Sequence, residues 1–315
     1  MSGVLLGSKG AARRSSGQMK KARQGFFKKY GWSYLFILPS ILVFAIFTFA
    51  PAIWALLISF QHYFFRWNGQ WVGFKNYVDA FTFGDGVFGR AIENTLYYTV
   101  ITVTASILIA LALAGLLQRC NKFWRTVFLG AYYLPAVTSA VIVAISWRWI
   151  YNGEFGLFNY LLGLVHLAPV RWLSDPNIVL NSIVLSTILT VPATGVVLFN
   201  AAMSGVPGEL YEAARIDGAG GIRQWWSITL PLIKPTTLYL VVIYTIYSFQ
   251  VFDKVFVMLP SGVADSAQFI VTQIYQNGFV SFYFGIASAQ GFILLLMIAS
   301  VAFVQFRVLR TDVEY

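Results

Sequence analysis

Charged residues are scarce in this chain of 315 residues. They make up 11% of the sequence, whereas a soluble globular protein carries about 25%. Apolar residues, in contrast, make up 58%. So few charges cannot cover a surface that faces water on all sides. The composition therefore argues against an ordinary soluble domain and indicates a polytopic membrane protein.

Cysteine and histidine are also nearly missing, and with them the motifs of several enzyme classes. The single cysteine, Cys120, excludes an internal disulfide framework and a cysteine-rich metal site. His62 and His166 lie far apart and outside the apolar runs, and there is neither an HExxH helix for zinc nor a GxxxxGK[ST] loop for ATP. We therefore expect no catalytic residues, no metal and no cofactor bound by this chain.

Positive charge is concentrated at the amino terminus. The net charge is +10, and residues 1–30 contain no acid but eight basic residues, which are Lys9, Arg13, Arg14, Lys20, Lys21, Arg23, Lys28 and Lys29. A basic tail directly before an apolar run is typical of a cytoplasmic anchor, so we predict this role for residues 1–30 rather than nucleic-acid binding. The run from Tyr34 to Phe60 is too long for the apolar part of a signal peptide, and no small-residue cleavage site follows it.

Six apolar windows are long enough, or nearly so, for the roughly 20 residues that a helix needs to cross a bilayer. They lie at residues 33–60, 95–117, 126–147, 177–203, 235–252 and 282–306. The sequence thus predicts an all-α membrane domain over residues 31–315 with six transmembrane helices. Prolines inside the windows, at Pro39, Pro51, Pro135 and Pro192, fit either a transport path or ordinary kinks.

The charges of the loops predict the orientation of these helices. The loop 118–125 is basic and lacks acids, and two arginines follow residue 306, so both are expected inside the cell. The loops 61–93 and 150–176 are not basic overall and fit the outside. Both termini and the segment at about 205–234 are therefore expected in the cytoplasm.

Three outer segments are expected to be more than plain loops. Residues Gln70–Phe81 and Gly153–Leu162 mix aromatic and polar side chains, which favours short helices at the membrane interface. Residues 266–281 hold four amide side chains and make a poor bilayer segment, so we expect a docking surface there.

The segment between the fourth and fifth windows predicts two short helices with a turn between them. Pro207 stands before the first helix, where its missing N–H would have no partner in any case. Gly218 suits the left-handed residue that ends a helix. The stretch IRQWWSIT predicts a second helix, which we expect to close at Pro231.

The composition of the first short helix fits a surface that another molecule approaches closely. Ala213 and Ala214 have little side-chain bulk, and Glu212 and Arg215 offer charges at the rim. On physical grounds alone, the helix pair would either dock on a protein partner or lie on the lipid headgroups.

This segment resembles the EAA motif of the membrane subunits of bacterial ABC importers. The matching residues are Glu212, Ala213 and Ala214, then Asp217, Gly218 and Ala219, and then Ile228, Leu230 and Pro231. Further stretches are similar to the carbohydrate-type branch, that is, to maltose and glycerol-3-phosphate importer permeases; they are VGFKNY (Val72–Tyr77), ENTLYYT (Glu93–Thr99), Tyr133–Asn159 and FDKVFVM (Phe252–Met258). The pattern departs after Met258, where relatives often have a T-x-GGP-like turn and this chain has LPSGVADS.

The resemblance implies a type I ABC importer permease fold in the bacterial inner membrane. It implies that residues 212–219 form the coupling helix and turn, docked on a cytoplasmic ATPase dimer that binds ATP and Mg²⁺. A second, related permease chain would complete a heterodimer, and an extracytoplasmic solute-binding protein would deliver a sugar or sugar derivative. Glycerol 3-phosphate or a related phosphodiester is an alternative cargo. An ion-coupled secondary transporter is less favoured, because the apolar windows hold no acidic residue.

A few polar side chains within the windows are candidates for the solute path. Tyr244, Tyr247 and Gln250 recur along one slanted face of the fifth window, and Thr190 and Thr194 flank Pro192 in the fourth. Such side chains also commonly form hydrogen bonds between membrane helices, as Asn200 and Gln290 would. The spans contain no central Lys or Arg, which favours a neutral sugar.

Overall fold

The structure is a computed structural model that describes the chain except residues 1–31, 66, 83, 85, 260–265 and 310–315. The chain comprises two compact units, Met1–Leu57 and Ile58–Tyr315. The predicted basic tail 1–30 and most of the LPSGVADS stretch lie outside the described residues, so both predictions stay untested.

The first apolar window forms one helix, Trp32–Ser59, of 28 residues. It includes a π-helical turn, η1 (Ala45–Phe49), which leads directly into α2 (Ala50–Ser59). Pro51 lacks the N–H that an α-helix needs at this point, and a local π turn is one way in which membrane helices accommodate that loss. At ~1.5 Å per residue the helix exceeds the ~30 Å hydrocarbon core of a bilayer.

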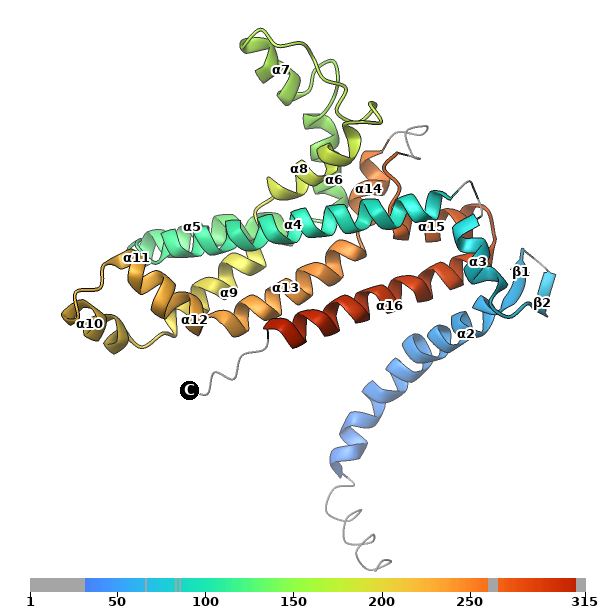
Figure 1. Cartoon of the computed structure of the whole chain (residues 1–315), viewed down its shortest axis with the longest axis horizontal. Coiled ribbons are helices and arrows are strands. Elements are labelled where there is room, and N and C mark those ends of the chain that lie inside the picture. The colour runs from blue at the N-terminus through green and yellow to red at the C-terminus, as the bar shows by residue number, and fades with distance from the viewer. Residues whose placement is uncertain (1–31, 66, 83, 85, 260–265, 310–315) are drawn as a thin grey trace, which may run out of the picture. The chain divides into compact units, whose positions relative to one another are not determined.

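Three long helices run alongside one another in the second unit (Figure 1). They are α4 (Val87–Leu117), α13 (Lys234–Phe249) and α16 (Phe284–Leu309). Two further helices, α5 (Lys122–Val137) and α9 (Ala193–Ser204), pack on each other, and α9 also packs against α4. The second, fifth and sixth windows therefore correspond to α4, α13 and α16.

The other spans are broken rather than straight. The third window divides into α5 and α6 (Ala140–Ile150), which meet at an angle of 94° where Thr138 and Ser139 adopt extended backbone. The fourth divides into α8 (Val179–Ile188) and α9, with Pro192 at the break. By length and composition, the described residues thus provide four helices able to cross a membrane, Val179–Ser204 among them. The number rises to six if two bent pairs, α5 with α6 and Gly221–Leu232 with α13, each count as one span.

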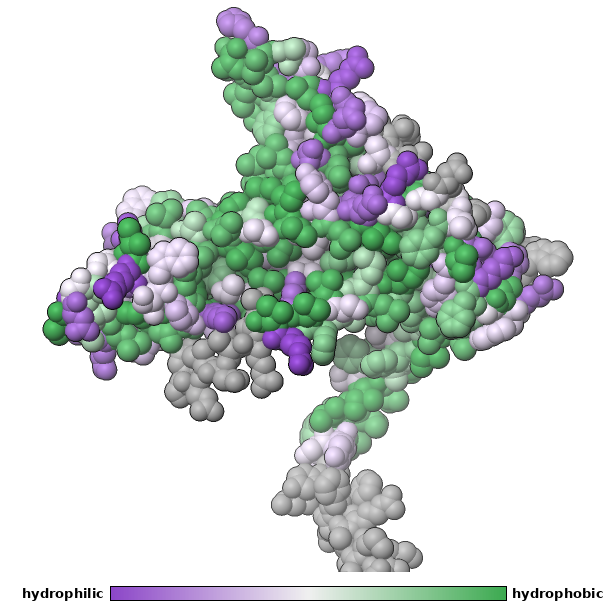
Figure 2. Space-filling model, viewed as in Figure 1, coloured by the Kyte–Doolittle hydropathy of each residue, from purple (hydrophilic) through white to green (hydrophobic). Residues whose placement is uncertain are grey.

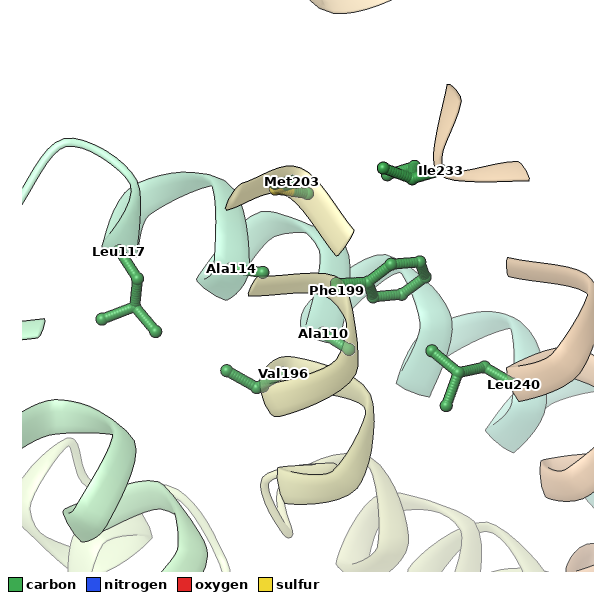
Figure 3. Packing of buried hydrophobic residues seen from close by; sticks show 8 residues of the cluster. All are labelled: Ala110, Ala114, Leu117, Val196, Phe199, Met203, Ile233 and Leu240. Carbon is green, nitrogen blue, oxygen red and sulfur yellow. The ribbon is translucent and has the colours of Figure 1, made fainter. Parts of the chain in front are cut away.

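A hydrophobic cluster joins α4, α9 and α13 near one end of the bundle (Figure 3). Ala110 and Ala114 of α4 are fully buried, and their small side chains let α9 approach closely. Phe199 of α9, also fully buried, fills the space between these alanines and Leu240 of α13. This contact fixes α9, the second half of the fourth span, relative to α4 and α13.

The all-α prediction missed a small sheet. Strands β1 (Gln61–Phe64) and β2 (Trp67–Trp71) form a two-stranded antiparallel hairpin, which α3 (Lys75–Thr82) follows. Asn76 anchors this end, because its Nδ2 donates to the carbonyl oxygens of Ser59 and Gln61 at 2.8 Å each. The helix predicted for residues 70–81 therefore starts only at Lys75, since Gln70 and Trp71 pair with β1.

The second predicted interfacial helix is present as α7 (Leu157–Leu164), while residues 266–281 form α15 (Ile270–Tyr275) and a π turn, η3 (Gln276–Val280). Three amide side chains of this last segment, Gln268, Gln273 and Asn277, are buried. These amides thus attach the segment to the core, and docking of a partner on residues 266–281 stays a prediction.

Hydrophobic side chains cover much of the middle of the second unit, and hydrophilic ones gather at the α10 end, at the hairpin end and on the projecting part that carries α7 (Figure 2). On α4, Leu96, Val100, Leu108 and Leu116 are exposed large apolar residues at four- or eight-residue spacing, as expected of a face that meets lipid or another membrane chain. Helix α10 (Gly208–Ile216) and the end of α16 lie at one end of the bundle, and the hairpin and α15 lie at the other (Figure 1). The α10 segment and the end of α16 thus lie away from the hairpin, and the orientation of the chain in the membrane stays a prediction.

Candidate functional site

The segment with the EAA-like residues forms a helix and a tight turn. Helix α10 has Pro207 as its N-cap and ends at Asp217. Gly218 follows with φ +78°, and its N–H donates to the carbonyl of Arg215 at 3.1 Å. The N–H of Ala219 then reaches back to the carbonyl of Ala214 at 2.8 Å. Glycine is thus required where the sequence predicts the left-handed cap, because this backbone conformation is unfavourable for residues with a Cβ.

The second helix of this segment is longer than expected. Helices α11 (Gly221–Gln224) and α12 (Leu230–Leu232) are joined by a π turn, η2 (Trp225–Thr229), into one helical run. The predicted closure at Pro231 is therefore wrong. The π turn shifts the hydrogen-bond register, so that the N–H of Leu230 donates to the carbonyl of Trp225, and Pro231 fits within the following turn. A bend of 65° then leads into α13.

Most of the EAA-like residues face outward. Glu212, Ala213, Arg215, Asp217 and Gly218 are exposed, whereas Ala214 and Ala219 are half-buried. Two large apolar side chains next to them are also uncovered, since Ile216 is 88% and Ile222 81% exposed. Charges beside uncovered isoleucines are the composition of a surface that a protein partner covers.

The segment that contains α10, α11 and α12 is attached to the bundle by a small set of contacts. The Tyr211 hydroxyl lies 2.9 Å from the Thr229 hydroxyl, which joins α10 to η2. The Gln224 side chain donates to the carbonyl of Ala219 at 2.9 Å and so supports the turn. Between this segment and the end of α4 lies a cavity of about 670 Å³, with Gly115 and Trp225 among its lining residues.

The buried Asn200 holds α4, α5 and α9 together next to this cavity. Its side-chain oxygen accepts from Gln118 Nε2 at 3.1 Å and from Arg125 Nε at 2.9 Å. Arg125 also contacts the hydroxyl of Ser204. Asn200 therefore bonds between helices, as does Gln290, whose side-chain oxygen accepts from Asn277 at 3.0 Å.

A second cavity, of about 270 Å³, lies where the fourth span is broken. Thr187, Thr190 and Pro192 line it from the α8–α9 break, and Tyr244 and Tyr247 line it from α13. Broken membrane helices are typical of solute paths, because freed backbone groups are tolerated beside a cavity. We refer to this space as the bundle cavity.

The structure brings together three of the five predicted path residues. Thr190, Tyr244 and Tyr247 line the bundle cavity, whereas Thr194 and Gln250 are exposed and do not line it. Gln250 is the C-cap of α13, beyond the last helical turn.

Two of these three predicted residues already form hydrogen bonds within the protein. Thr190 accepts from Trp147 Nε1 at 3.1 Å, and the hydroxyl of Tyr244 accepts from the N–H of Gly195 at 2.8 Å. Tyr247, in contrast, is 68% exposed. The same cavity wall thus contains interhelical hydrogen bonds, and a role of these residues in a solute path stays a prediction.

The sequence analysis overlooked Lys254. It belongs to α14 (Asp253–Met258), a short helix outside the candidate spans that packs against α6 and carries Lys254 back into the bundle cavity. Its Nζ donates to the Thr187 hydroxyl at 2.9 Å and lies 6.0 Å from the centre of the Trp147 ring. Burial lowers the pKa of this amine to about 7. The lone lysine in the apolar stretch FDKVFVM was the available signal.

Comparison with known proteins finds a matching family and several relatives of similar length. Residues 103–311 match the family described as binding-protein-dependent transport system inner membrane component. The chain is 31% identical to the probable ABC transporter permease YurN of Bacillus subtilis, over 89% of this chain and 97% of that protein. It is also 31% identical to the arabinooligosaccharide permease AraP of the same species, over 90% of each chain, and 29% identical to the sn-glycerol-3-phosphate permease UgpA of Agrobacterium fabrum, over 90% of this chain and 96% of that one.

A solved structure has the same fold. A chain of a bacterial ABC transporter that imports the acidic polysaccharide alginate aligns with a TM-score of 0.82 and 26% identity, over 93% of this chain and 100% of that chain. The same kind of transporter is also known in complex with an alginate pentasaccharide-bound periplasmic protein, with a TM-score of 0.81, 25% identity and coverage of 92% and 99% of the two chains.

Proposed function

Because this chain belongs to the family of binding-protein-dependent transport system inner membrane components, we propose that it is one permease subunit of an ATP-driven importer for a sugar or sugar derivative. The relatives named for arabinooligosaccharide, glycerol-3-phosphate and alginate transport support the substrate class. The chain itself supplies the path, and a separate subunit hydrolyses ATP.

The observation that carries this proposal is the uncovered α10 with its Gly218 turn. The EAA-like residues stand at one end of the bundle, and the apolar neighbour Ile216 is almost fully exposed. A rigid short helix with a small-residue face and a charged rim suits a groove on an ATPase subunit. Docking there would connect nucleotide-driven movement of the ATPase pair to the bundle, and coupling of this kind needs a physical contact that differs between two states.

Three partners complete the proposed machine. A cytoplasmic ATPase dimer binds ATP and Mg²⁺ and receives α10. A second, homologous permease chain covers the apolar faces that this chain leaves exposed in the membrane, such as Val100 and Leu108 of α4. A solute-binding protein docks at the opposite end; the existence of the alginate transporter in complex with a periplasmic protein supports such a partner. We place the assembly in the bacterial inner membrane, with the α10 end in the cytoplasm.

Two alternatives lead to different measurements. A glycerol-3-phosphate or phosphodiester importer would use the same machinery with another cargo. An ion-coupled secondary transporter would need no ATPase; it is disfavoured because the apolar windows contain no acidic residue to carry a coupling ion.

The test is uptake by proteoliposomes that contain this chain, its partner permease and the ATPase. ³H-labelled arabinotriose, glycerol 3-phosphate and a uronic-acid trisaccharide are offered with the cognate binding protein. We expect uptake of one cargo that requires both ATP and the binding protein and that a protonophore does not reduce. Uptake driven by a proton or sodium gradient without ATP would overturn the proposal.

A further inference from the structure

Lys254 is a cationic side chain in the bundle cavity without an anionic partner in the part of the chain that the structure describes. Its Nζ bonds to a neutral hydroxyl, that of Thr187, and faces an aromatic ring, that of Trp147. Burial, which disfavours the charged form, lowers the pKa of this amine. The neighbouring Asp253 is exposed, whereas Lys254 is half-buried.

A purely structural role explains this arrangement poorly. A buried ammonium without a counter-ion costs free energy, because the protein replaces its hydration only in part. A threonine hydroxyl and the face of an indole ring compensate for some of that cost, since both present negative potential to the cation. They also leave hydrogen-bond donors of the ammonium unused, because the group has three and one is engaged with Thr187.

The surroundings of Lys254 suit a carbohydrate. Hydroxyl groups of Tyr98, Thr102, Thr190 and Tyr244 line the same cavity, and the ring of Tyr247 offers an apolar face. A cavity of about 270 Å³ has the volume of roughly nine liquid water molecules, at ~30 Å³ each, which is enough for one sugar ring. The ammonium of Lys254 among these hydroxyl groups would favour a solute that carries a negative charge.

On the premise that the chain is a sugar importer permease, we propose that Lys254 binds an acidic group of the solute in the bundle cavity, so that the cargo is an anionic sugar derivative. The acidic group is a carboxylate or a phosphate, both of which accept hydrogen bonds from an ammonium. This proposal reverses the expectation of a neutral sugar. That expectation rested on the absence of a central Lys or Arg from the spans, whereas Lys254 reaches the cavity from α14, outside the spans.

Hydrogen bonding around Thr187 supports the site as one unit. Its hydroxyl accepts from Lys254, lies 3.0 Å from the hydroxyl of Tyr98, and donates to the carbonyl of Ile183 at 3.2 Å. These contacts hold the ammonium at the wall of the cavity in one orientation. An arriving acidic group therefore meets an amine whose position is already fixed, and its negative charge favours the protonated form of that amine.

The experiment compares three probes and three variants in the complete importer with its cognate binding protein. The probes are arabinotriose, a uronic-acid trisaccharide and glycerol 3-phosphate, which are neutral, carboxylate-bearing and phosphate-bearing. The variants are Lys254→Met, which removes the charge, Lys254→Arg, which keeps it, and Lys122→Met, which removes an exposed lysine on α5, far from the cavity lining. Melting temperature in detergent is measured for each, so that loss of fold is separated from loss of binding.

We expect uptake of an acidic probe, and which of the two is taken up distinguishes carboxylate from phosphate. Lys254→Met should lower kcat/KM for that probe by about 10- to 100-fold, the usual effect of losing a hydrogen bond to a charged group. Lys254→Arg should retain at least about a third of the wild-type value, and Lys122→Met should match wild type.

Three results would overturn the inference while leaving the proposed function intact. The first is ATP-driven uptake of arabinotriose with neither acidic probe transported. The second is uptake of an acidic probe that Lys254→Met does not change. The third is a fall in kcat/KM in Lys254→Met that a matching fall in melting temperature and yield explains. An assembly that does not hydrolyse ATP in response to any loaded binding protein would count against the proposed function instead.

Discussion

Replacing Gly218 by valine tests the role of the turn after α10 without creating a steric clash. A Cβ at this position would meet no atom within 4 Å, so the added side chain has room. The backbone, however, has φ +78°, which is unfavourable for residues with a Cβ. The substitution therefore acts on the conformation of the turn and on nothing else in the immediate surroundings.

The magnitude follows from this backbone conformation. A left-handed conformation costs an L-residue with a side chain about 1–2 kcal/mol, and β-branched residues tolerate it least. A cost of this size reduces the equilibrium constant between the native turn and its alternatives by a factor of about 5 to 30. If the turn must be in place for α10 to transmit movement, ATP hydrolysis stimulated by solute and binding protein should fall by up to the same factor.

The assay is the stimulated ATPase rate of the reconstituted importer, with basal ATPase and assembly measured in parallel. Gly218→Asn is the matched control, because asparagine adopts the left-handed conformation more readily than other residues with a side chain. We expect the stimulated rate to decrease in the order glycine, asparagine, valine, with assembly unchanged. Equal stimulated rates for the valine and asparagine variants would refute the reasoning.

Two further predictions concern packing and loop order. Gly195→Ala would place a methyl group 2.5 Å from the Tyr244 hydroxyl and 2.9 Å from the side chain of Ala110, so we expect a loss of about 1–3 kcal/mol of stability. The loss, measured by thermal unfolding in detergent, should be smaller in the Tyr244→Phe background, which lacks that hydroxyl. Identical losses in both backgrounds would contradict this prediction. Asn159→Leu removes the bonds to Gly153, Val170 and Trp172, so residues 153–172 should be cleaved faster in limited proteolysis than in wild type, and unchanged cleavage would contradict this.

The sequence predicts the main helices because long apolar windows have few other structures in a bilayer. The windows at 95–117 and 282–306 correspond to α4 and α16, and the glycine cap at Gly218 is where the turn chemistry requires it. Local signals of this kind depend only on residues near one another in the chain.

Features that depend on distant residues were missed. The 94° bend between α5 and α6 and the pairing of β1 with β2 arise from packing, which hydropathy does not record. The place of Lys254 in the cavity was missed because the sequence does not reveal that α14 folds back against α6. The path residues Thr194 and Gln250 failed to join the cavity for a related reason, since the helices end or break beside them.

Cross-linking from α10 tests most directly the central claim that this chain works by docking on an ATPase. The single native cysteine is replaced by Cys120→Ser, and a new one is introduced by Ala213→Cys on exposed α10 or, as a control, by Tyr160→Cys on exposed α7. In the assembled, transporting complex, we predict an adduct between position 213 and the ATPase subunit and none from position 160. A complex that transports without any adduct at position 213, or that yields the ATPase adduct from position 160, would contradict the account.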